Sequence, residues 1–454
     1  MVFILVDDMG WMDISANGSR FYETPNVDRL AAEGMRFTQA YAASPICSPT
    51  RASILTGKNP ARINLTQWIG GPGNPDYVKN LPLEEVLLPE ALKPAGYTNG
   101  FFGKWHLNNK AGEKTFWPQA QGFDLNVAGH WRGGLYIPNQ FFSPWNMPNI
   151  ENGPDGEYIT DRLAADTAQF IEDQKDGPFL AYVYFYTVHA PFCAPKDRVE
   201  KYAKKSKAMG LTDAERFGQA HAGGKPFKYR KAQDHPTYGA MVESMDMAVG
   251  TILDKIKALG LEDNTIVCFF SDNGGLSTSE GTPTANTPLR AGKGWLYEGG
   301  IREPAIIKWP GEVKPGTVSD AVITSMDFYP SILEMAGLPL RPDQHTDGKS
   351  LVPVLRQQTK QVHEAAYFHY PHRSNQRGEP CGAIRVGDYK LINFFKDNRL
   401  ELYNLKDDIS ETNNLAEDLP QLRDDMLGML YAWWDDVDAR FPRGFARLPN
   451  IPIK

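Results

Sequence analysis

The chain contains few cysteines for its length, and their spacing excludes two common uses of this residue. Only four of the 454 residues are cysteine, and they are Cys47, Cys193, Cys268 and Cys381. Disulfide-stabilised small proteins are dense in cysteine, and zinc sites use closely spaced pairs, so these residues match neither pattern. If Cys47 takes part in chemistry, three cysteines remain and at least one of them is unpaired. Cysteine usage therefore indicates no particular cellular compartment.

The chain also lacks long apolar runs, an excess of positive charge, and internal repeats. No run approaches the about 20 apolar residues that a membrane-spanning helix needs, so we expect no membrane span. The formal net charge of -7 argues against a general partner for nucleic acids or anionic membranes. The absence of repeats and low-complexity segments excludes repeat architectures and leaves a globular chain that is long enough for two or three domains.

Strand-like and helix-like patterns alternate through the first three-quarters of the chain. A continuous apolar run is typical of a strand that is covered on both faces, and one lies at 2–6. Further strands are expected at 97–102, 179–186 and 265–270. Amphipathic helical spacing separates these segments, most clearly over 238–259. The alternation predicts an α/β fold with a large, mostly parallel mixed sheet and helices on both faces.

The pattern changes near residue 362. Short alternating strands are expected at 365–370, 383–386, 389–394 and 400–403, and a terminal helix follows at 419–439. We therefore expect a main domain over residues 1–361 and a smaller C-terminal antiparallel sheet with one helix over 362–454. The segment 196–231 carries eleven Lys or Arg against four Asp or Glu. It is either a solvated, partly helical excursion or a basic lip that attracts a polyanion.

Polar side chains follow four of the predicted strands. They are Asp7 and Asp8, Lys104 and His106, His189, and Asp272 and Asn273. The carboxyl ends of parallel strands lie at one edge of a sheet, where ligands bind in folds of this class, so these side chains should meet there. Each has a structural alternative, because Asp pairs and Asp-Asn-Gly runs are common in turns and a histidine can be buried in a core. Their joint occurrence favours a functional site.

The chemistry of these side chains points to a hard metal ion beside an anion. The hard-oxygen set consists of Asp7, Asp8, Asp272 and Asn273. Three carboxylates and one amide oxygen suit Ca²⁺, with Mg²⁺ as the alternative ion. The positive groups are Arg51, Lys104, Lys293, His106 and His189. Such groups hold an anion and stabilise the charge that develops in a transition state.

Residues 45–57 form a pattern that is typical of a turn leading into a helix. Ser48 is the expected N-cap, Pro49 suits the first helical position, and Gly57 suits the end. Cys47 would then lie just before a helix N-terminus, which favours negative charge, with Arg51 one turn further on. On position alone, Cys47 is either an activated thiolate nucleophile or a buried structural thiol.

The same stretch, P-I-C-S-P-T-R-A-S-I-L-T-G, resembles the signature of the type I sulfatases, C-x-P-x-R followed by two apolar residues, Thr and Gly. Residues 96–106 resemble the second signature of that family, except that Asn99 stands where Thr or Ser is usual and Phe102 where a smaller residue is common. Both departures are at strand positions, so they bear on packing more than on Lys104 or His106. The resemblance covers nearly the whole chain and implies an alkaline phosphatase-like fold and a sulfuric ester hydrolase.

The resemblance also implies a nucleophile and a metal shell. Cys47 would be oxidised to Cα-formylglycine by a maturation enzyme, and the hydrate of that aldehyde would attack the sulfur of a sulfate ester. The residues implied to hold the metal are Asp7, Asp8, Asp272 and Asn273, completed by residue 47. A thiolate would be a poor ligand for so hard an ion, and an oxygen hydrate removes that mismatch.

The remaining candidates acquire roles in the same way. Arg51 would steady the hydrate, while Lys104, His189 and Lys293 would grip the sulfate. His189 or Lys293 would assist the departing alcohol. His106 would take a proton from the second hydrate hydroxyl, which expels sulfate and restores the aldehyde. The resemblance thus implies covalent catalysis with a metal-activated nucleophile.

Residues 368–373 and 383–391 resemble C-terminal stretches of bacterial-type sulfatases that act on sulfated carbohydrates. The residues expected to bind sugar hydroxyls are His369, His372, Arg373 and Arg385. The alternative is a strand edge that packs on the main domain. Aromatic residues within 101–145 offer stacking faces. We expect exo-acting removal of sulfate from a terminal sugar, with a galactose-type unit as the specific hypothesis.

Two other functions stay open from the sequence. One is a phosphodiester or phosphonate monoester hydrolase of the same superfamily, since some of these enzymes share C-x-P-x-R. The other is a catalytically silent binder of sulfated glycans, which would need a lost functional residue. The chain opens directly with the run 2–6, whereas sulfatases of this kind usually carry a few more residues there and often a signal peptide. We therefore expect a mature or shortened form of a periplasmic or secreted protein.

Overall fold

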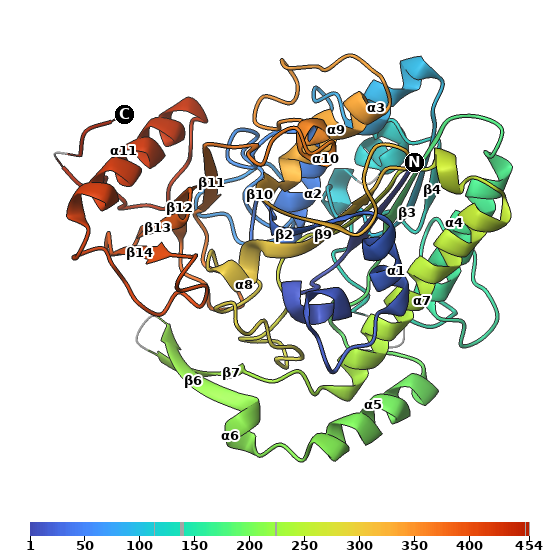
Figure 1. Cartoon of the computed structure of the whole chain (residues 1–454), viewed down its shortest axis with the longest axis horizontal. Helices are drawn as coiled ribbons and strands as arrows, with labels where there is room; N and C mark the ends of the chain where they lie inside the picture. The colour runs from blue at the N-terminus through green and yellow to red at the C-terminus, as the bar shows by residue number, and fades with distance from the viewer. Residues whose placement is uncertain (113, 137–139, 223–224, 450, 454) are drawn as a thin grey trace.

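Eight strands form a central mixed sheet in the computed structural model, which describes residues 1–454 except 113, 137–139, 223–224, 450 and 454 (Figure 1). The strand order is β10-β2-β9-β8-β1-β5-β3-β4. The bounds are β1 (Val2–Val6), β2 (Met35–Tyr41), β3 (Thr98–Gly103), β4 (Leu125–Val127), β5 (Phe179–Tyr184), β8 (Val267–Ser271), β9 (Arg302–Lys308) and β10 (Thr317–Thr324). Only the pairings of β9 with β2 and β8 are antiparallel among the described strands of this sheet. The predicted mostly parallel mixed sheet is confirmed.

The side chains of β1 alternate between two helical layers. Phe3 and Leu5 belong to one core, with α2 (Cys47–Thr56), α3 (Leu88–Leu92), α9 (Phe328–Met335) and α10 (Val352–Leu355). Val2, Ile4 and Val6 belong to the core on the other face, with α1 (Pro25–Glu33), α4 (Ile159–Asp173) and α7 (Pro236–Ala258). Successive side chains of a strand point to opposite faces, so a continuous apolar run is what a sheet covered on both faces requires.

A second sheet follows the main one in the chain. It has the order β11-β12-β13-β14 and is antiparallel throughout. Its elements are β11 (Ala365–Tyr370), β12 (Cys381–Val386), β13 (Tyr389–Phe394), β14 (Leu400–Asn404) and the helix α11 (Pro420–Asp436). One face packs on α11, and the other packs on residues of the main sheet and its loops, among them Tyr41, Trp295 and Ile301. Figure 1 shows this part as the orange to red lobe. The boundary at residue 361 stays a prediction.

Some elements escape the sequence patterns. The segment after β5 contains α5 (Lys196–Met209), α6 (Asp213–Arg216) and the hairpin of β6 (Phe217–Ala222) and β7 (Lys225–Arg230). Its elements carry many exposed polar residues, so their periodicity is weak. The edge strand β4 is only three residues long. The other edge strand, β10, mixes polar residues with apolar ones, and Val318 is 54% exposed. In the described part of the chain, no helix combines the length and apolarity needed to cross a membrane.

Candidate active site

The predicted meeting of polar side chains at one edge of the sheet occurs where β1, β8, β5 and β3 end. Asp7 and Asp8 follow β1, and Asp272 and Asn273 follow the adjacent parallel strand β8. The backbone N–H of Asp272 donates to Val6 O at 3.1 Å, which sets the two strand ends side by side. His189 comes from the loop after β5, the neighbour of β1 on its other side.

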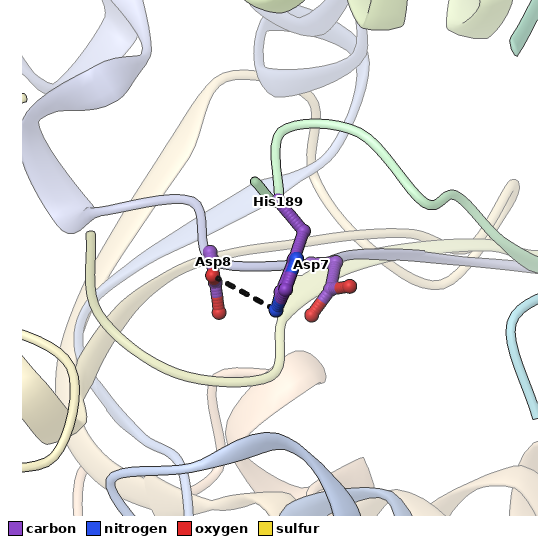
Figure 2. A group of neighbouring side chains, drawn as sticks. All are labelled: Asp7, Asp8 and His189. Carbon is purple, nitrogen blue, oxygen red and sulfur yellow. Dashed lines mark ion pairs between the residues drawn. The ribbon is translucent and has the colours of Figure 1, made fainter. Parts of the chain in front are cut away.

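Asp7, Asp8 and His189 form a compact buried group (Figure 2). One ligand atom from each lies within 4.8 Å of the others, and His189 Nε2 is 3.6 Å from Asp8 Oδ2. Asp8 has a φ of 62°, a conformation that is uncommon outside glycine and that is found repeatedly at functional sites. The hydroxyl of Tyr238 donates to Asp8 O at 3.2 Å and to Asp13 Oδ2 at 2.6 Å, which helps to hold this backbone.

Three buried cations face the three carboxylates. Lys104 Nζ lies 2.5 Å from Asp7 Oδ2, and Lys293 Nζ lies 2.7 Å from each oxygen of Asp8. The third pair is Arg51 with Asp272, joined by hydrogen bonds of 2.9 and 3.0 Å. Burial alone would raise the pKa of Asp7, but Lys104, His189 and Arg51 hold it below its usual range. The formal charges of the three pairs cancel.

The helix α2 presents Cys47 to this cluster. It begins at Cys47, with Ile46 in the N-cap position, so the prediction of Ser48 as N-cap is wrong. Ser48 Oγ instead donates to His106 O at 2.9 Å. This hydrogen bond helps to hold the loop that carries His106. Cys47 is 4% exposed. Burial raises the pKa of its thiol despite the nearby Lys104, which argues against a thiolate nucleophile.

His106 is oriented toward position 47. Its Nε2 lies 3.0 Å from Ile69 O, and its Nδ1 lies 3.5 Å from Cys47 Sγ. A carbonyl oxygen only accepts, so the contact with Ile69 places the proton on Nε2 and leaves Nδ1 as the acceptor. Burial, followed by the charges of Lys104 and Arg51, lowers the pKa of His106 well below its usual value. A neutral imidazole therefore directs the lone pair of Nδ1 toward position 47 and toward Ser48 Oγ, which lies 3.3 Å away.

Two oxygens of the cluster that lack a hydrogen bond among the described residues fit a hard cation, and one of them, Asp7 Oδ1, lies 3.5 Å from Arg51 Nη2. Asp7 Oδ1 and Asn273 Oδ1 are buried and accept no hydrogen bond from the residues that the structure describes. The amide of Asn273 is oriented by its nitrogen, which donates to Asp8 Oδ1 at 2.9 Å and to Gly274 O at 3.1 Å. Carboxylate and amide oxygens are the ligands that Ca²⁺ and Mg²⁺ prefer. The residues Asp7, Asp8, Asp272 and Asn273 thus fit such an ion, with His189 beside them.

The structure does not bring His369 and Arg385 into this cluster. His369 Nε2 is 2.8 Å from Arg440 O, and its ring packs on aromatic residues of the C-terminal lobe. Arg385 is 3% exposed and is hydrogen-bonded to the Tyr41 hydroxyl and to Gln39 of β2. Both residues are engaged in packing, because β11 and β12 are covered on both faces by α11 and the main domain.

His372 and Arg373 lie on a loop that approaches the cluster. His372 is 1% exposed, and its Nε2 is 2.9 Å from Thr66 Oγ1. Arg373 is exposed. The next residue, Ser374, lies close to Gly294. A Cβ atom added to Gly294 would lie 2.0 Å from Ser374 Oγ. Gly294 directly follows Lys293, so this loop borders the site.

Tyr136 is a site residue that the sequence patterns do not single out. Its side chain is 64% exposed, yet its hydroxyl lies 3.5 Å from His189 Nε2 and its ring packs edge-on against the His189 ring. Burial raises the pKa of this hydroxyl, and the positive charge of Lys293 acts in the opposite direction. The only signal in the sequence is its place in an irregular aromatic stretch suited to pocket walls.

Comparisons with known proteins show the family of the chain. The sequence model of the Sulfatase family matches residues 1–338, and that of the N-sulphoglucosamine sulphohydrolase C-terminal region matches residues 291–428. A "Sulfatase" of Formosa agariphila is 33% identical over 92% of this chain and 85% of its own. The N-acetylgalactosamine-6-sulfatase of Mus musculus is 32% identical over 98% of this chain and 82% of its own.

Solved structures are similar as well. The crystal structure of Ps i-CgsB in complex with k-i-k-neocarrahexaose superposes with a TM-score of 0.76 at 27% identity, over 98% of this chain and 94% of that one. The family match over residues 1–338 and the curated relatives that are more than 30% identical lead to one conclusion. The chain belongs to the sulfatase family, as a type I sulfatase of the alkaline phosphatase superfamily that hydrolyses sulfate esters.

Proposed function

We propose that this enzyme removes sulfate from sulfated saccharides, with a formylglycine made from Cys47 as nucleophile and one Ca²⁺ as cofactor. The observation that carries the proposal is the environment of Cys47. Its thiol is buried beside hard oxygen ligands and 3.5 Å from an accepting His106 Nδ1. Sulfur matches a hard cation poorly, whereas the hydroxyl of a hydrated aldehyde matches both the cation and the acceptor.

The charges of the site support a sulfate ester as ligand. Lys104, Lys293 and Arg51 are buried against three carboxylates, so the cluster is formally neutral by itself. A bound Ca²⁺ would supply a fixed positive charge beside the sulfate. An anionic ester, with one negative charge, offsets half of that added charge. Lys104, Lys293 and His189 are then the groups that hold the sulfate oxygens, and Arg51 orients residue 47 and Asp272.

Two proton positions follow from the hydrogen bonds. His106 Nδ1 can accept a proton from a hydroxyl at position 47, since Nε2 is committed to Ile69 O and the nearby Ser48 hydroxyl donates to His106 O. At the other side of the site, His189 Nδ1 lies 2.5 Å from Ala190 O, so its Nε2 faces Asp8 and the mouth of the site. With its Nδ1 proton donated to Ala190 O, His189 carries a proton on Nε2 only as the imidazolium. In that form His189, or otherwise the ammonium group of Lys293, would give a proton to the departing alcohol.

The saccharide part of the proposal rests on the rim of the site and on relatives. The exposed Tyr136 ring offers a stacking face beside His189, and Arg373 is an exposed donor near Lys293. An N-acetylgalactosamine-6-sulfatase and a structure with a bound neocarrahexaose are among the relatives. They support a terminal sulfated sugar, with a galactose-type unit as the specific hypothesis. A maturation enzyme for Cys47 and a periplasmic or secreted location belong to the same proposal.

The proposal is tested by mass spectrometry of the Cys47 peptide and by a panel of sulfated saccharides. We expect mass spectrometry to find an aldehyde in place of the Cys47 thiol, and we expect Cys47→Ala to lose turnover. At least one galactose-type or N-acetylgalactosamine-type saccharide should be desulfated. This desulfation should stop when a chelator removes the metal from the protein. Full activity in Cys47→Ala would refute the nucleophile. Faster turnover of aryl phosphonate than of aryl sulfate esters would favour the phosphonate hydrolase, and no turnover of any ester by the modified protein would favour a silent binder.

A further inference from the structure

A buried charged group lies between the C-terminal lobe and the main domain, outside the site described above. Its centre is Lys390 of β13, whose Nζ lies 3.0 Å from Glu298 Oε1 and 2.9 Å from Glu411 Oε1. All three side chains are 0% exposed. Burying ionised groups costs free energy, so stability alone does not explain why this charged group is present.

Glu411 contacts residues 290–298 through both its side chain and its backbone. Its Oε2 accepts the backbone N–H of Glu298 at 2.7 Å, and its carbonyl oxygen accepts Arg290 Nη1 at 2.6 Å. Arg290 is further held by the Tyr403 hydroxyl at 3.0 Å and lies over the Tyr297 ring. The lobe therefore holds both ends of residues 290–298 of the main domain, the stretch that contains Lys293.

Residues 290–300, which Glu411 contacts, are hydrogen-bonded to the loop that follows the expected metal ligands Asp272 and Asn273. Lys293 N donates to Gly275 O at 3.2 Å, and Gly274 N donates to Gly300 O at 3.2 Å. The backbones approach so closely that a Cβ on Gly274 would lie 1.9 Å from Gly299 O. A shift of residues 290–300 would therefore move the loop that begins at Asn273, as well as Lys293 itself.

We propose that Glu411 is a positioning residue, which together with Lys390 holds residues 290–300 so that Lys293 and Asn273 keep their places at Asp8. The C-terminal lobe then has a part in catalysis without contributing a group to the reaction. The inference rests on the proposed role of Lys293 in holding sulfate.

The charges around Glu411 make the contact specific. Glu298 has further partners, because its Oε2 accepts from the Tyr41 hydroxyl at 2.7 Å and from Arg302 Nη1 at 3.3 Å. Glu298 thus stays paired when Glu411 is removed. The backbone N–H of Glu298 has no such reserve when the Glu411 carboxylate is removed, and a buried donor without an acceptor is unfavourable. Arg290 keeps its bonds to the carbonyl oxygen of residue 411 and to the Tyr403 hydroxyl.

The test compares Glu411→Ala and Glu411→Gln with Arg62→Met as matched control. Arg62 joins the same two domains elsewhere, through Asp347 at 2.9 Å and Asp436 of α11 at 2.6 Å. The readouts are the inhibition constant of inorganic sulfate, kcat and KM for a small aryl sulfate, and Tm. We expect Glu411→Ala to weaken inhibition by sulfate and to lower kcat/KM, each by about tenfold. Glu411→Gln keeps an acceptor for the Glu298 N–H and should recover part of the loss.

The control separates positioning from stability. Arg62→Met should lower Tm and leave the sulfate inhibition constant unchanged. Equal sulfate inhibition constants in Glu411→Ala and wild type would overturn the proposal, as would equal losses in Glu411→Ala and Arg62→Met. If Glu411→Ala does not fold, Glu411→Gln and Lys390→Met provide the same comparison. A Lys293→Ala variant with unchanged sulfate inhibition would refute the sulfate role of Lys293, and thereby the proposed function of that residue, independently of Glu411.

Discussion

Arg51 donates two hydrogen bonds to a single oxygen of Asp272, from Nε at 3.0 Å and from Nη2 at 2.9 Å. Both side chains are fully buried, and the guanidinium carbon lies 3.5 Å from the centre of the Tyr184 ring. The other oxygen of Asp272 accepts the backbone N–H of Asp8 at 3.2 Å. The arginine of the signature therefore orients an expected metal ligand, and its Nη1 also donates to Lys104 O at 2.6 Å.

This contact predicts that Arg51→Lys weakens metal binding. Lysine keeps the charge but cannot form the fork to Asp272 Oδ2 or stack on Tyr184. Loss of a residue that orients a ligand typically costs about 10- to 100-fold in metal affinity or activity. Calorimetric titration of the metal-free variant with Ca²⁺ measures this loss directly. Arg62→Lys is the matched control, because Arg62 also donates two hydrogen bonds to one carboxylate, that of Asp347, outside the candidate site. Equal Ca²⁺ affinity in Arg51→Lys and wild type would contradict the prediction.

Tyr136 should discriminate between substrates. We expect Tyr136→Ala to raise KM for a sulfated saccharide by roughly tenfold, since an aromatic contact of this kind is worth up to about 1.5 kcal/mol. The inhibition constant of inorganic sulfate should stay unchanged, because sulfate itself is held by deeper groups. Tyr136→Phe keeps the ring and should behave like wild type toward the saccharide. Arg373→Ala should resemble Tyr136→Ala. If Tyr136→Ala changed the KM of the saccharide and the inhibition constant of inorganic sulfate by the same factor, Tyr136 would act through His189 alone.

Asp13 should make stability depend on pH. Burial raises the pKa of Asp13 from 3.8 to about 6, although Tyr238, Thr284 and Gln233 donate hydrogen bonds to it. A raised pKa in the folded state means that the folded protein binds the proton more tightly than the unfolded chain. The stabilisation is complete below about pH 4 and is lost as pH rises through 6.

The corresponding measurement is the unfolding free energy of wild type relative to Asp13→Asn, by urea denaturation between pH 4 and pH 7. A shift of about two units corresponds to roughly 3 kcal/mol, so the wild type should lose up to that amount relative to the variant over this range. The amide does not titrate, and contributions from other groups cancel in the difference. A difference that is constant with pH would show that Asp13 has an ordinary pKa in the folded protein.

Much of the fold follows from local patterns. Residues 365–370 and 389–394 form strands with the bounds that their alternation predicts. The run 2–6 is a central strand because each of its residues is apolar, as a strand between two helical layers requires. The edge strands β4 and β10 escaped prediction, because edge strands are less buried and carry a mixed pattern that resembles a loop.

The candidate site divides in the same way. Asp7, Asp8, Asp272 and Asn273 were predictable as a group, because parallel strands place their carboxyl ends at one edge. Tyr136 and Glu411 were not, since each comes from an irregular segment whose course depends on packing. His369 and Arg385 illustrate the reverse case. Their residue types suit sugar binding, but contacts with Arg440 and with β2 engage both in packing.

By itself, the sequence determined the reaction class and the residues available for it. A signature around Cys47 and polar residues after apolar runs are local features, and neighbouring residues along the chain are sufficient to specify them. Only the tertiary structure decided how these residues pair: Arg51 with Asp272, Lys104 with Asp7, Lys293 with Asp8, and His106 with Ile69 O. These partners are separated by 37 to 285 positions in the chain. Their pairing depends on strand order, register and the packing of the C-terminal lobe, which no local pattern encodes.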